Sequence, residues 1–305
     1  MNGIIIIDKP AGITSFDVVS RLRKITGERR IGHAGTLDPM ATGVLPVFLG
    51  SATKAIDLLP SQTKGYTAGF RLGVTTDTGD ITGKVLSETA VKIGYTEVEK
   101  TVLSFAGESL QLPPMYSAIK HNGVRLYALA REGITVERKP RPIRIDKIGL
   151  TAGDPAAQIY TIDVLCSKGT YIRTIITDIG EQLGCGAAMT SLRRTSSTGF
   201  DLKNAFTLET VAELAAAGKL GECLLDIEAP FCEFFEVKVT QKQAVRFLNG
   251  GGLSYDRLEK TPIGELCRIK NAGSFLGLAE NDIENRTLKV KCLFAGSLTN
   301  EDHRA

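Results

Sequence analysis

Short strand-like and helix-like segments follow one another irregularly along most of the chain, and this order limits the folds available. A continuous apolar run indicates a short buried strand at 4–7, and alternating apolar residues indicate strands at 66–72 and 159–164. Helical periodicity indicates helices at 14–27, 96–107 and 172–184. A doubly wound parallel sheet would need a regular repeat of strand, helix and strand. The irregular order therefore predicts an α+β fold instead.

The first two predicted helices carry local start signals. Thr14 followed three residues later by Asp17 is a capping pattern, and Gly27 is a typical stop after the last turn. Thr96 and Glu99 have the same spacing at the second helix. We therefore expect both helices to be capped by a threonine side chain.

Beyond residue 226 the pattern changes to short strands between glycine turns. A helix predicted at 207–217 is followed by strand-like runs at 235–239, 265–269, 275–279 and 288–294. A length of 305 residues also favours two domains. We predict a first domain at 1–230 and a small β-rich domain at 231–305.

Composition and charge narrow the class of protein only slightly. With 43% hydrophobic and 23% charged residues the chain resembles soluble globular proteins, and a net charge of +3 does not demand a nucleic-acid partner. The six cysteines show no CxxC spacing, and the four N-terminal isoleucines are too few for a signal peptide or membrane span. These features predict a cytoplasmic protein without membrane association, and the lack of a coiled-coil heptad favours a monomer.

The segment 32–43, GHAGTLDPMATG, has the composition of a loop that approaches a ligand. Its glycines allow close backbone approach, and Asp38 is its only carboxylate. An aspartate before a proline more often caps a turn than performs chemistry. On residue types alone, Asp38 is a candidate for either role.

A second candidate surface is the basic segment 113–147. It holds eight lysines and arginines against three acidic residues, with Tyr116, His121 and Tyr127 among them. Such a mixture suits contact with RNA phosphates and bases. It also suits an ordinary solvated face, and composition does not separate the two readings.

The sequence offers no convincing cofactor or metal site. The glycines at 184 and 186 end a helix and do not follow a strand, so they do not form a dinucleotide fingerprint. Three histidines do not suggest a metal cluster, and Asp77 and Asp80 stand among threonines and glycines that favour a turn. We expect neither a metal nor a cofactor.

Several ordered motifs resemble the TruB-type pseudouridine synthases. GHAGTLDPMATG is similar to their catalytic motif. Other similar segments are KPAGITS (9–15), KGYTAGFRLG (64–73), TDTGD (76–80), SKGTYIRT (167–174) and LRRTSSTGF (192–200). The resemblance implies a catalytic domain with a mixed, largely antiparallel sheet. GSFLGLAE (273–280) is similar to the core of a PUA-type RNA-binding domain, which implies a PUA-like C-terminal domain.

The same resemblance implies roles for individual residues. Asp38 would be the catalytic nucleophile or base, Tyr66 would stack on the target uracil, and Arg173 would hold the Asp38 carboxylate bidentately. His33, Tyr171, Leu192 and Lys9 would belong to the substrate-binding set, with Lys9 and Pro10 supporting the catalytic loop. Without the motifs, Arg173 reads as a structural ion-pair partner and Tyr66 as a core residue.

By this resemblance the chain is expected to convert uridine 55 in the T loop of tRNA to pseudouridine, by base flipping and without a cofactor. Two alternatives stay open. One is a noncatalytic tRNA-binding chaperone on the same fold, and the other is a different modification enzyme, such as a methyltransferase, which would need a methyl donor.

Overall fold

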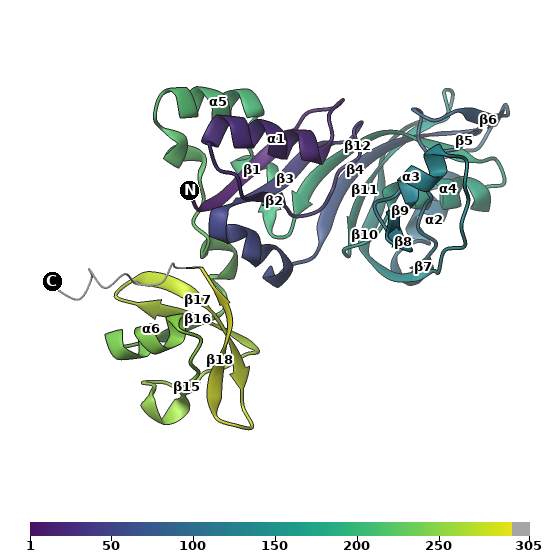
Figure 1. Cartoon of the computed structure of the whole chain (residues 1–305). Helices are drawn as coiled ribbons and strands as arrows, with labels where there is room; N and C mark the ends of the chain where they lie inside the picture. Colours follow the sequence, from purple (N-terminus) through teal and green to yellow (C-terminus); the bar gives the residue numbers. More distant parts are fainter. Residues whose placement is uncertain (295–305) are drawn as a thin grey trace.

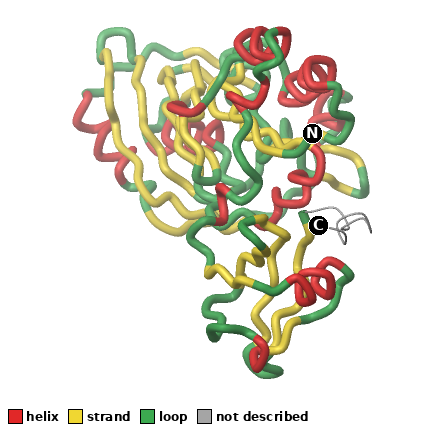
Figure 2. Tube along the Cα trace, turned by 90° about the vertical axis from the view of Figure 1, so that its left-hand side faces the viewer, coloured by secondary structure: helices red, strands yellow, loops and turns green. Residues whose placement is uncertain are grey.

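Two β-sheets organise the chain, as the computed structural model shows for residues 1–294 (Figure 1). The larger sheet has nine strands and belongs to the first part of the chain, whereas a five-stranded sheet forms the C-terminal part. Figure 2 shows the smaller sheet standing below one end of the larger one. Within residues 1–294, no helix is both long enough and apolar enough to cross a membrane.

The larger sheet is mixed and largely antiparallel, as predicted. Along its main path the strands are β1 (Gly3–Lys9), β3 (Thr42–Leu49), β12 (Ala187–Ser197), β4 (Lys64–Leu72), β11 (Ile159–Cys166), β10 (Arg141–Asp154) and β7 (Gly107–Gln111), with β2 (Ile31–His33) paired to β3 and β13 (Phe200–Asp201) to β12. Only the pairing of β3 with β12 is parallel in this sheet. The central position of β12 and β4 pairs segments that lie far apart in the chain, such as 64–66 with 194–197.

Helices cover the larger sheet in two groups. Its helices are α1 (Ser15–Thr26), α2 (Tyr95–Leu103), α3 (Leu126–Arg131), α4 (Ile172–Gln182) and α5 (Leu208–Ala216), and two small hairpins are β5 (Val74–Thr76) with β6 (Val85–Glu88) and β8 (Lys120–His121) with β9 (Val124–Arg125). In Figure 1, α1 and α5 lie side by side near β1, while α2 and α4 lie at the opposite end. Buried apolar residues of α4, among them Ile175, Ile176 and Ile179, pack against the sheet in one core cluster. This packing fixes α4, whose first turn carries Arg173.

The capping prediction is confirmed for α1 and wrong for α2. Thr14 and Asp17 form a capping box, and Gly27 ends α1 in a left-handed conformation. The N-cap of α2 is instead Gly94, so the helix starts two residues early and Thr96 lies within its first turn. Glycine tolerates the extended N-cap backbone without a side-chain bond, so this cap leaves no side-chain signal in the sequence.

The C-terminal sheet confirms the predicted β-rich region. Its order is β14 (Phe235–Lys238), β16 (Leu266–Asn271), β17 (Ser274–Asp282), β18 (Thr287–Leu293) and β15 (Leu253–Ser254), and the helix α6 (Gln241–Leu248) packs beside it. We did not predict α6, although Thr240 and Gln243 form a capping box that marks its start. The part of the second predicted domain at 295–305 lies outside the described residues.

An aromatic cluster joins the two sheets. The ring of Phe231 lies 6.1 Å from that of Phe294 and 6.3 Å from that of Phe275, between centroids. These rings belong to the same buried cluster as Ile4 and Phe48 of the larger sheet. The exact boundary at residue 230 stays a prediction, because this core is continuous across it.

Candidate active site

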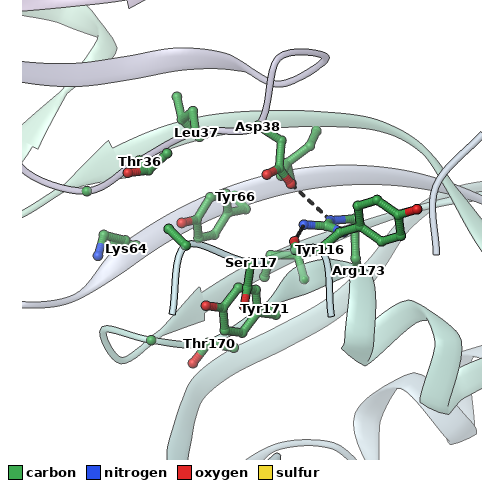
Figure 3. A pocket seen from close by; sticks show the side chains of 15 residues that line it. Thr36, Leu37, Asp38, Lys64, Tyr66, Tyr116, Ser117, Thr170, Tyr171 and Arg173 are labelled. Atoms are coloured by element: carbon green, nitrogen blue, oxygen red, sulfur yellow. Dashed lines mark hydrogen bonds and ion pairs between the residues drawn. The ribbon is translucent and has the colours of Figure 1, made fainter. Parts of the chain in front are cut away.

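A cavity of about 260 Å³ opens where the centre of the larger sheet meets the loop before β3 and the start of α4 (Figure 3). Strand β4 and strand β12 form one wall, and the segment 116–118 closes another. The lining residues are Gly35, Thr36, Leu37, Asp38, Lys64, Tyr66, Tyr116, Ser117, Ala118, Gly169, Thr170, Tyr171, Ile172, Arg173 and Leu192. Five of the seven predicted site residues therefore meet here.

The loop that carries Asp38 is clamped by the segment 9–15. The Gly12 N–H donates to the Pro39 carbonyl at 2.8 Å, and the Leu37 N–H donates to the Ser15 hydroxyl at 2.9 Å. The Lys9 ammonium donates to the same Pro39 carbonyl at 3.3 Å. The two motifs that stand apart in the sequence are thus one structural unit that holds Asp38 in place.

Gly43, the second residue of β3, follows this loop at a position where a side chain does not fit. Its φ of +103° is a conformation that side chains disfavour, and a Cβ there would lie 2.2 Å from the Arg194 carbonyl oxygen. The close approach belongs to the parallel pairing of β3 with β12. A larger residue at 43 would separate these strands and displace the loop.

Asp38 and Arg173 form an ion pair at the cavity. The Arg173 Nε donates to Asp38 Oδ2 at 2.9 Å, with 37% of the Asp38 side chain exposed against 6% for Arg173. The predicted bidentate contact is wrong, because the other two Arg173 nitrogens donate to the carbonyls of Thr78 and Tyr116 at 2.9 and 2.8 Å. Within residues 1–294, Asp38 Oδ1 accepts no hydrogen bond, which leaves it available to a ligand.

Asp80 does not line the cavity but lies beside Arg173, and the sequence predicted it only as part of a turn. It does build the turn, since its Oδ1 accepts from the Thr82 N–H at 3.0 Å and the Thr78 hydroxyl at 3.0 Å. Its other oxygen, Oδ2, lies 3.8 Å from the Arg173 Nε. The motif TDTGD therefore supplies a second, buried carboxylate beside the guanidinium.

Of the three tyrosines that line the cavity, Tyr66 and Tyr171 lie on opposite sides of it (Figure 3). Tyr66 is 8% exposed, and burial raises the pKa of its hydroxyl although the nearby Arg194 guanidinium opposes the rise. Burial likewise raises the pKa of Tyr171. The backbone of Tyr171 is held by Gln111, which accepts from its N–H at 2.8 Å and donates to its carbonyl at 3.1 Å. Both rings are thus positioned as neutral walls.

The pleat of the sheet explains why Leu192 and Arg194 accompany Tyr66. Side chains two residues apart on a strand share a face, and Arg194 lies directly opposite Tyr66 across the pairing of β12 with β4. Arg194 is 0% exposed, and its Nε and Nη2 donate to the carbonyls of Val44 and Gly35 at 2.7 and 3.0 Å. We did not predict Arg194 as a site residue, although its alternation with Leu192 points to it.

Lys64 was also missed. It precedes Tyr66 by two residues on β4 and lines the same cavity. The alternation used to predict this strand started at Tyr66, and extending it by two residues would have placed Lys64 beside the tyrosine.

Lys9 and His33 do not line the cavity. Lys9 is 0% exposed, and its ammonium also donates to the carbonyls of Pro10 and Ile13 at 2.8 and 2.7 Å. Burial lowers the pKa of Lys9 to about 8. His33 is half-buried on β2, and burial, with the Arg194 charge, lowers its pKa. The structure gives Lys9 the predicted supporting role, and nucleotide contact by either residue stays a prediction.

Residues 113–140 of the basic segment form an insertion between β7 and β10 that contains α3 and the β8–β9 hairpin, and residues 141–147 lie on β10. Lys139 and Arg141 are exposed. Arg138 is half-buried and donates to the Pro113 carbonyl at 2.8 Å, so it has a structural role as well. Among residues 1–294, no group of three or more histidine, cysteine or acidic side chains is arranged to hold a metal ion.

Comparison with known proteins agrees with this architecture. Residues 23–172 match the model of the TruB family pseudouridylate synthase N-terminal domain, and residues 173–231 match the tRNA pseudouridylate synthase B C-terminal domain. Among solved structures, the chain resembles one described as a Cbf5-Nop10-Gar1 complex, with a TM-score of 0.75, 25% identity, and coverage of 97% of this chain and 85% of the other.

Curated relatives extend the match over nearly the whole chain. The tRNA pseudouridine synthase B of Geotalea uraniireducens is 46% identical over 99% of both chains. That of Dehalococcoides mccartyi is 41% identical over 93% of this chain and 94% of the relative. These matches share the fold and cover the cavity described above. The chain belongs to the TruB family of pseudouridylate synthases, which are isomerases.

Proposed function

We propose that this enzyme converts uridine 55 in the T loop of tRNA to pseudouridine, with the uridine flipped into the cavity and Asp38 as the reacting carboxylate. The observation that carries the proposal is the exposed Asp38 carboxylate, which faces the cavity while Arg173 holds one of its oxygens at 2.9 Å. The similarity to proteins named tRNA pseudouridine synthase B supports tRNA as the substrate.

The reaction requires only groups that line the cavity. The bond between N1 and the ribose C1′ breaks, a bond between C5 and C1′ forms, the C5 proton leaves, and N1 gains a proton. Atoms and electrons balance without an oxidant or a group donor. A carboxylate can attack carbon or accept a proton and later leave, and the Arg173 guanidinium holds the Asp38 carboxylate at 2.9 Å.

A base stacked in RNA cannot undergo this reaction, so the uridine must leave the stack at a cost of a few kcal/mol. Tyr66 is the residue placed to replace the lost stacking, which is worth about 1–3 kcal/mol per base. Its ring forms part of the cavity wall beside Leu192. The cavity is therefore suited to an extruded nucleotide.

RNA recognition would use surfaces outside the cavity. We assign a catalytic role to 1–230 and a PUA-like RNA-binding role to 231–305, with the basic segment 113–147 gripping the folded T arm. An A-form major groove is too narrow for side chains, so loop shape should decide recognition. The enzyme would act as a monomer on tRNA in the cytoplasm.

The test compares a T-arm hairpin with an anticodon-arm hairpin and with unmodified tRNA, without additives, and maps pseudouridine in each. The proposal expects product at position 55 in tRNA and at the equivalent position of the T-arm hairpin. Product confined to the anticodon hairpin would overturn the assigned position. RNA binding with no product in any substrate would favour the noncatalytic chaperone.

Charge reversal at Arg138, Lys139 and Arg141 tests the role of the basic segment 113–147 in RNA binding. We expect weaker binding of the T-arm hairpin and a flatter dependence of affinity on salt, by about one unit of slope for each lost phosphate contact. The modified position should not move, because the cavity selects the base. Lys139 and Arg141 alone form the cleaner variant, since Arg138 also supports the Pro113 carbonyl. Affinity that is indifferent to salt in the parent would contradict this role.

A further inference from the structure

The cavity has a second charged end, away from Asp38. In Figure 3, Lys64 and Arg173 lie on opposite sides of Tyr66. Lys64 and Tyr66 point to the same face of β4, and Arg194 lies opposite Tyr66 on β12. An ideal Cβ on Gly35 would lie 3.3 Å from the Lys64 Nζ and 3.4 Å from the Arg194 Nη1. The two cations therefore flank one point on the cavity wall.

Neither cation has an acidic partner in the part of the chain that the structure describes. Over residues 1–294, the Lys64 Nζ makes no hydrogen bond or ion pair. The buried Arg194 Nη1 has no hydrogen-bond partner, Nε and Nη2 donate to backbone carbonyls, and the titratable group beside Arg194 is the Tyr66 hydroxyl, which is not a carboxylate. Burying a charge without an opposite charge is unfavourable, and two like charges close together add to the cost. Such an arrangement suits a site completed by a negative group from a ligand.

The titration of these groups agrees with this geometry. Burial and the adjacent Arg194 charge lower the pKa of Lys64 to about 8. Burial also lowers the pKa of Arg194. The other titratable groups that act on Lys64 are Cys166 on β11 and Lys168 just beyond it. The fold without a ligand therefore makes the charged form of Lys64 less favourable than it is in water.

We propose that Lys64, with Arg194 behind it, stabilises the negative charge of the uracil ring while that ring is detached from the ribose. This inference rests on the proposed function. When the N1–C1′ bond breaks, its electron pair goes to the ring, where the charge spreads over N1 and the carbonyl oxygens. When C5 bonds to C1′ and loses its proton, N1 gains a proton and the ring becomes neutral. A fixed cation at that place stabilises the charge only while it exists.

A phosphate of the RNA backbone is the other anion that could reach this end. The ring is the better fit, because Lys64 is half-buried and lies two residues from the tyrosine expected to stack on the base. Exposed lysines and arginines of the insertion are available for phosphates. Loss of Lys64 should lower the reaction rate if its ligand is the uracil ring, because only the ring changes its charge during the reaction. It should lower the affinity if its ligand is a backbone phosphate.

The experiment uses the full chain with Lys64→Met, Lys64→Arg and the matched control Lys168→Met, which removes an exposed charge near the cavity. The single-turnover rate and the dissociation constant are measured with the T-arm hairpin at several salt concentrations. For Lys64→Met we expect a rate about 100-fold lower, as for removal of one charge-stabilising donor, and an affinity within threefold of the parent. Lys64→Arg should recover much of the rate, and Lys168→Met should keep it.

Two further readouts separate this role from a structural one. The melting temperature of Lys64→Met should equal or exceed that of the parent, because the change relieves repulsion with Arg194. The parent rate should fall above about pH 8 as the ammonium deprotonates, whereas Lys64→Arg should retain its rate there.

An unchanged rate with weaker, less salt-dependent binding in Lys64→Met would assign the site to a phosphate and overturn the inference. A parent-like rate and affinity would overturn it as well. If the parent itself forms no pseudouridine, the proposed function fails instead.

Discussion

The two ends of the cavity hold their cations in opposite ways. Arg173 is surrounded by acceptors, with Asp38 at 2.9 Å, Asp80 at 3.8 Å and two carbonyls completing its guanidinium. Lys64 lines the cavity with the buried Arg194 behind it, and neither pairs with a carboxylate among the described residues. A cation whose acceptors are already in the fold holds those acceptors in place. A cation without such acceptors can bind a negative group of a ligand.

This difference in acceptors indicates that the two ends of the cavity have separate roles. The Arg173 side holds the Asp38 carboxylate at the cavity, which positions it for reaction with the ribose or the base. The Lys64 side contributes once the bond to the ribose is broken. Variants at the two ends should therefore affect stability, affinity and rate in different proportions.

The largest effect is expected at Asp38. Asp38→Asn preserves shape and removes the reacting charge, so turnover should fall at least about 1,000-fold, as for the loss of a reacting group in other enzymes. Affinity for the T-arm hairpin should stay within threefold, because binding depends on other surfaces. Single-turnover rates and filter binding measure the two quantities, and turnover within tenfold of the parent would refute the assignment.

Arg173→Met should follow with a loss of about 100-fold or more, since it leaves the Asp38 and Asp80 carboxylates without their shared partner. If Arg173 acts through Asp38, combining the change with Asp38→Asn should add little to the loss. Arg193→Met is the matched control, because Arg193 pairs with Asp8 at 2.8 Å and does not line the cavity. Fully additive losses of rate in the double variant would contradict the proposal that Arg173 acts through Asp38.

Tyr66 lies between the two ends and should show a mixed effect. Tyr66→Phe keeps an aromatic face and should lower the rate about 10-fold with little change in affinity. Tyr66→Leu should also lose about 1–3 kcal/mol of base stacking, seen as weaker capture of the flipped uridine. Fluorescence of a 2-aminopurine next to the target reports extrusion. Equal, small losses in both variants would instead make Tyr66 a core residue.

The smallest effect is expected at Asp178, an α4 residue that lies at neither end of the cavity. Burial and Glu181 raise its pKa to about 6, so the folded state favours the protonated form. The stability this gives is present at pH 4 and is lost as pH rises through about 6. Asp178→Asn should therefore stabilise the fold above pH 6 by under about 1 kcal/mol, because solvent screens the half-exposed group. Thermal melts at pH 4.5 and 7.5 check this, and a change in turnover would be unexpected.

Local chemistry made much of the fold predictable. The capping pattern of Thr14 and Asp17 located α1 to the residue, and alternation located β4 and β11, because these signals lie within a few neighbouring residues. The cap of α2 was misplaced because glycine offers no side-chain signal. The resemblance of the motifs, more than any periodicity, identified Asp38 and Arg173 together.

The second end of the cavity could not be predicted in the same way. Arg194 acquires its position from its register with Tyr66, which joins residues far apart in the chain. That a lysine or arginine lacks an acidic partner is a property of the folded neighbourhood, and composition does not reveal it. The bidentate contact failed for the same reason, since the carbonyls of Thr78 and Tyr116 occupy the remaining nitrogens of Arg173.

The central claim is that this cavity isomerises one uridine of tRNA, and release of the C5 hydrogen measures that event directly. A tRNA carrying tritium at C5 of uridine 55 alone is incubated with the enzyme, without additives, beside a tRNA labelled at an anticodon-loop uridine. We expect one tritium released per molecule of the first tRNA, in step with pseudouridine formation, and none from the second. No release from position 55 by an enzyme that binds the tRNA would contradict the account.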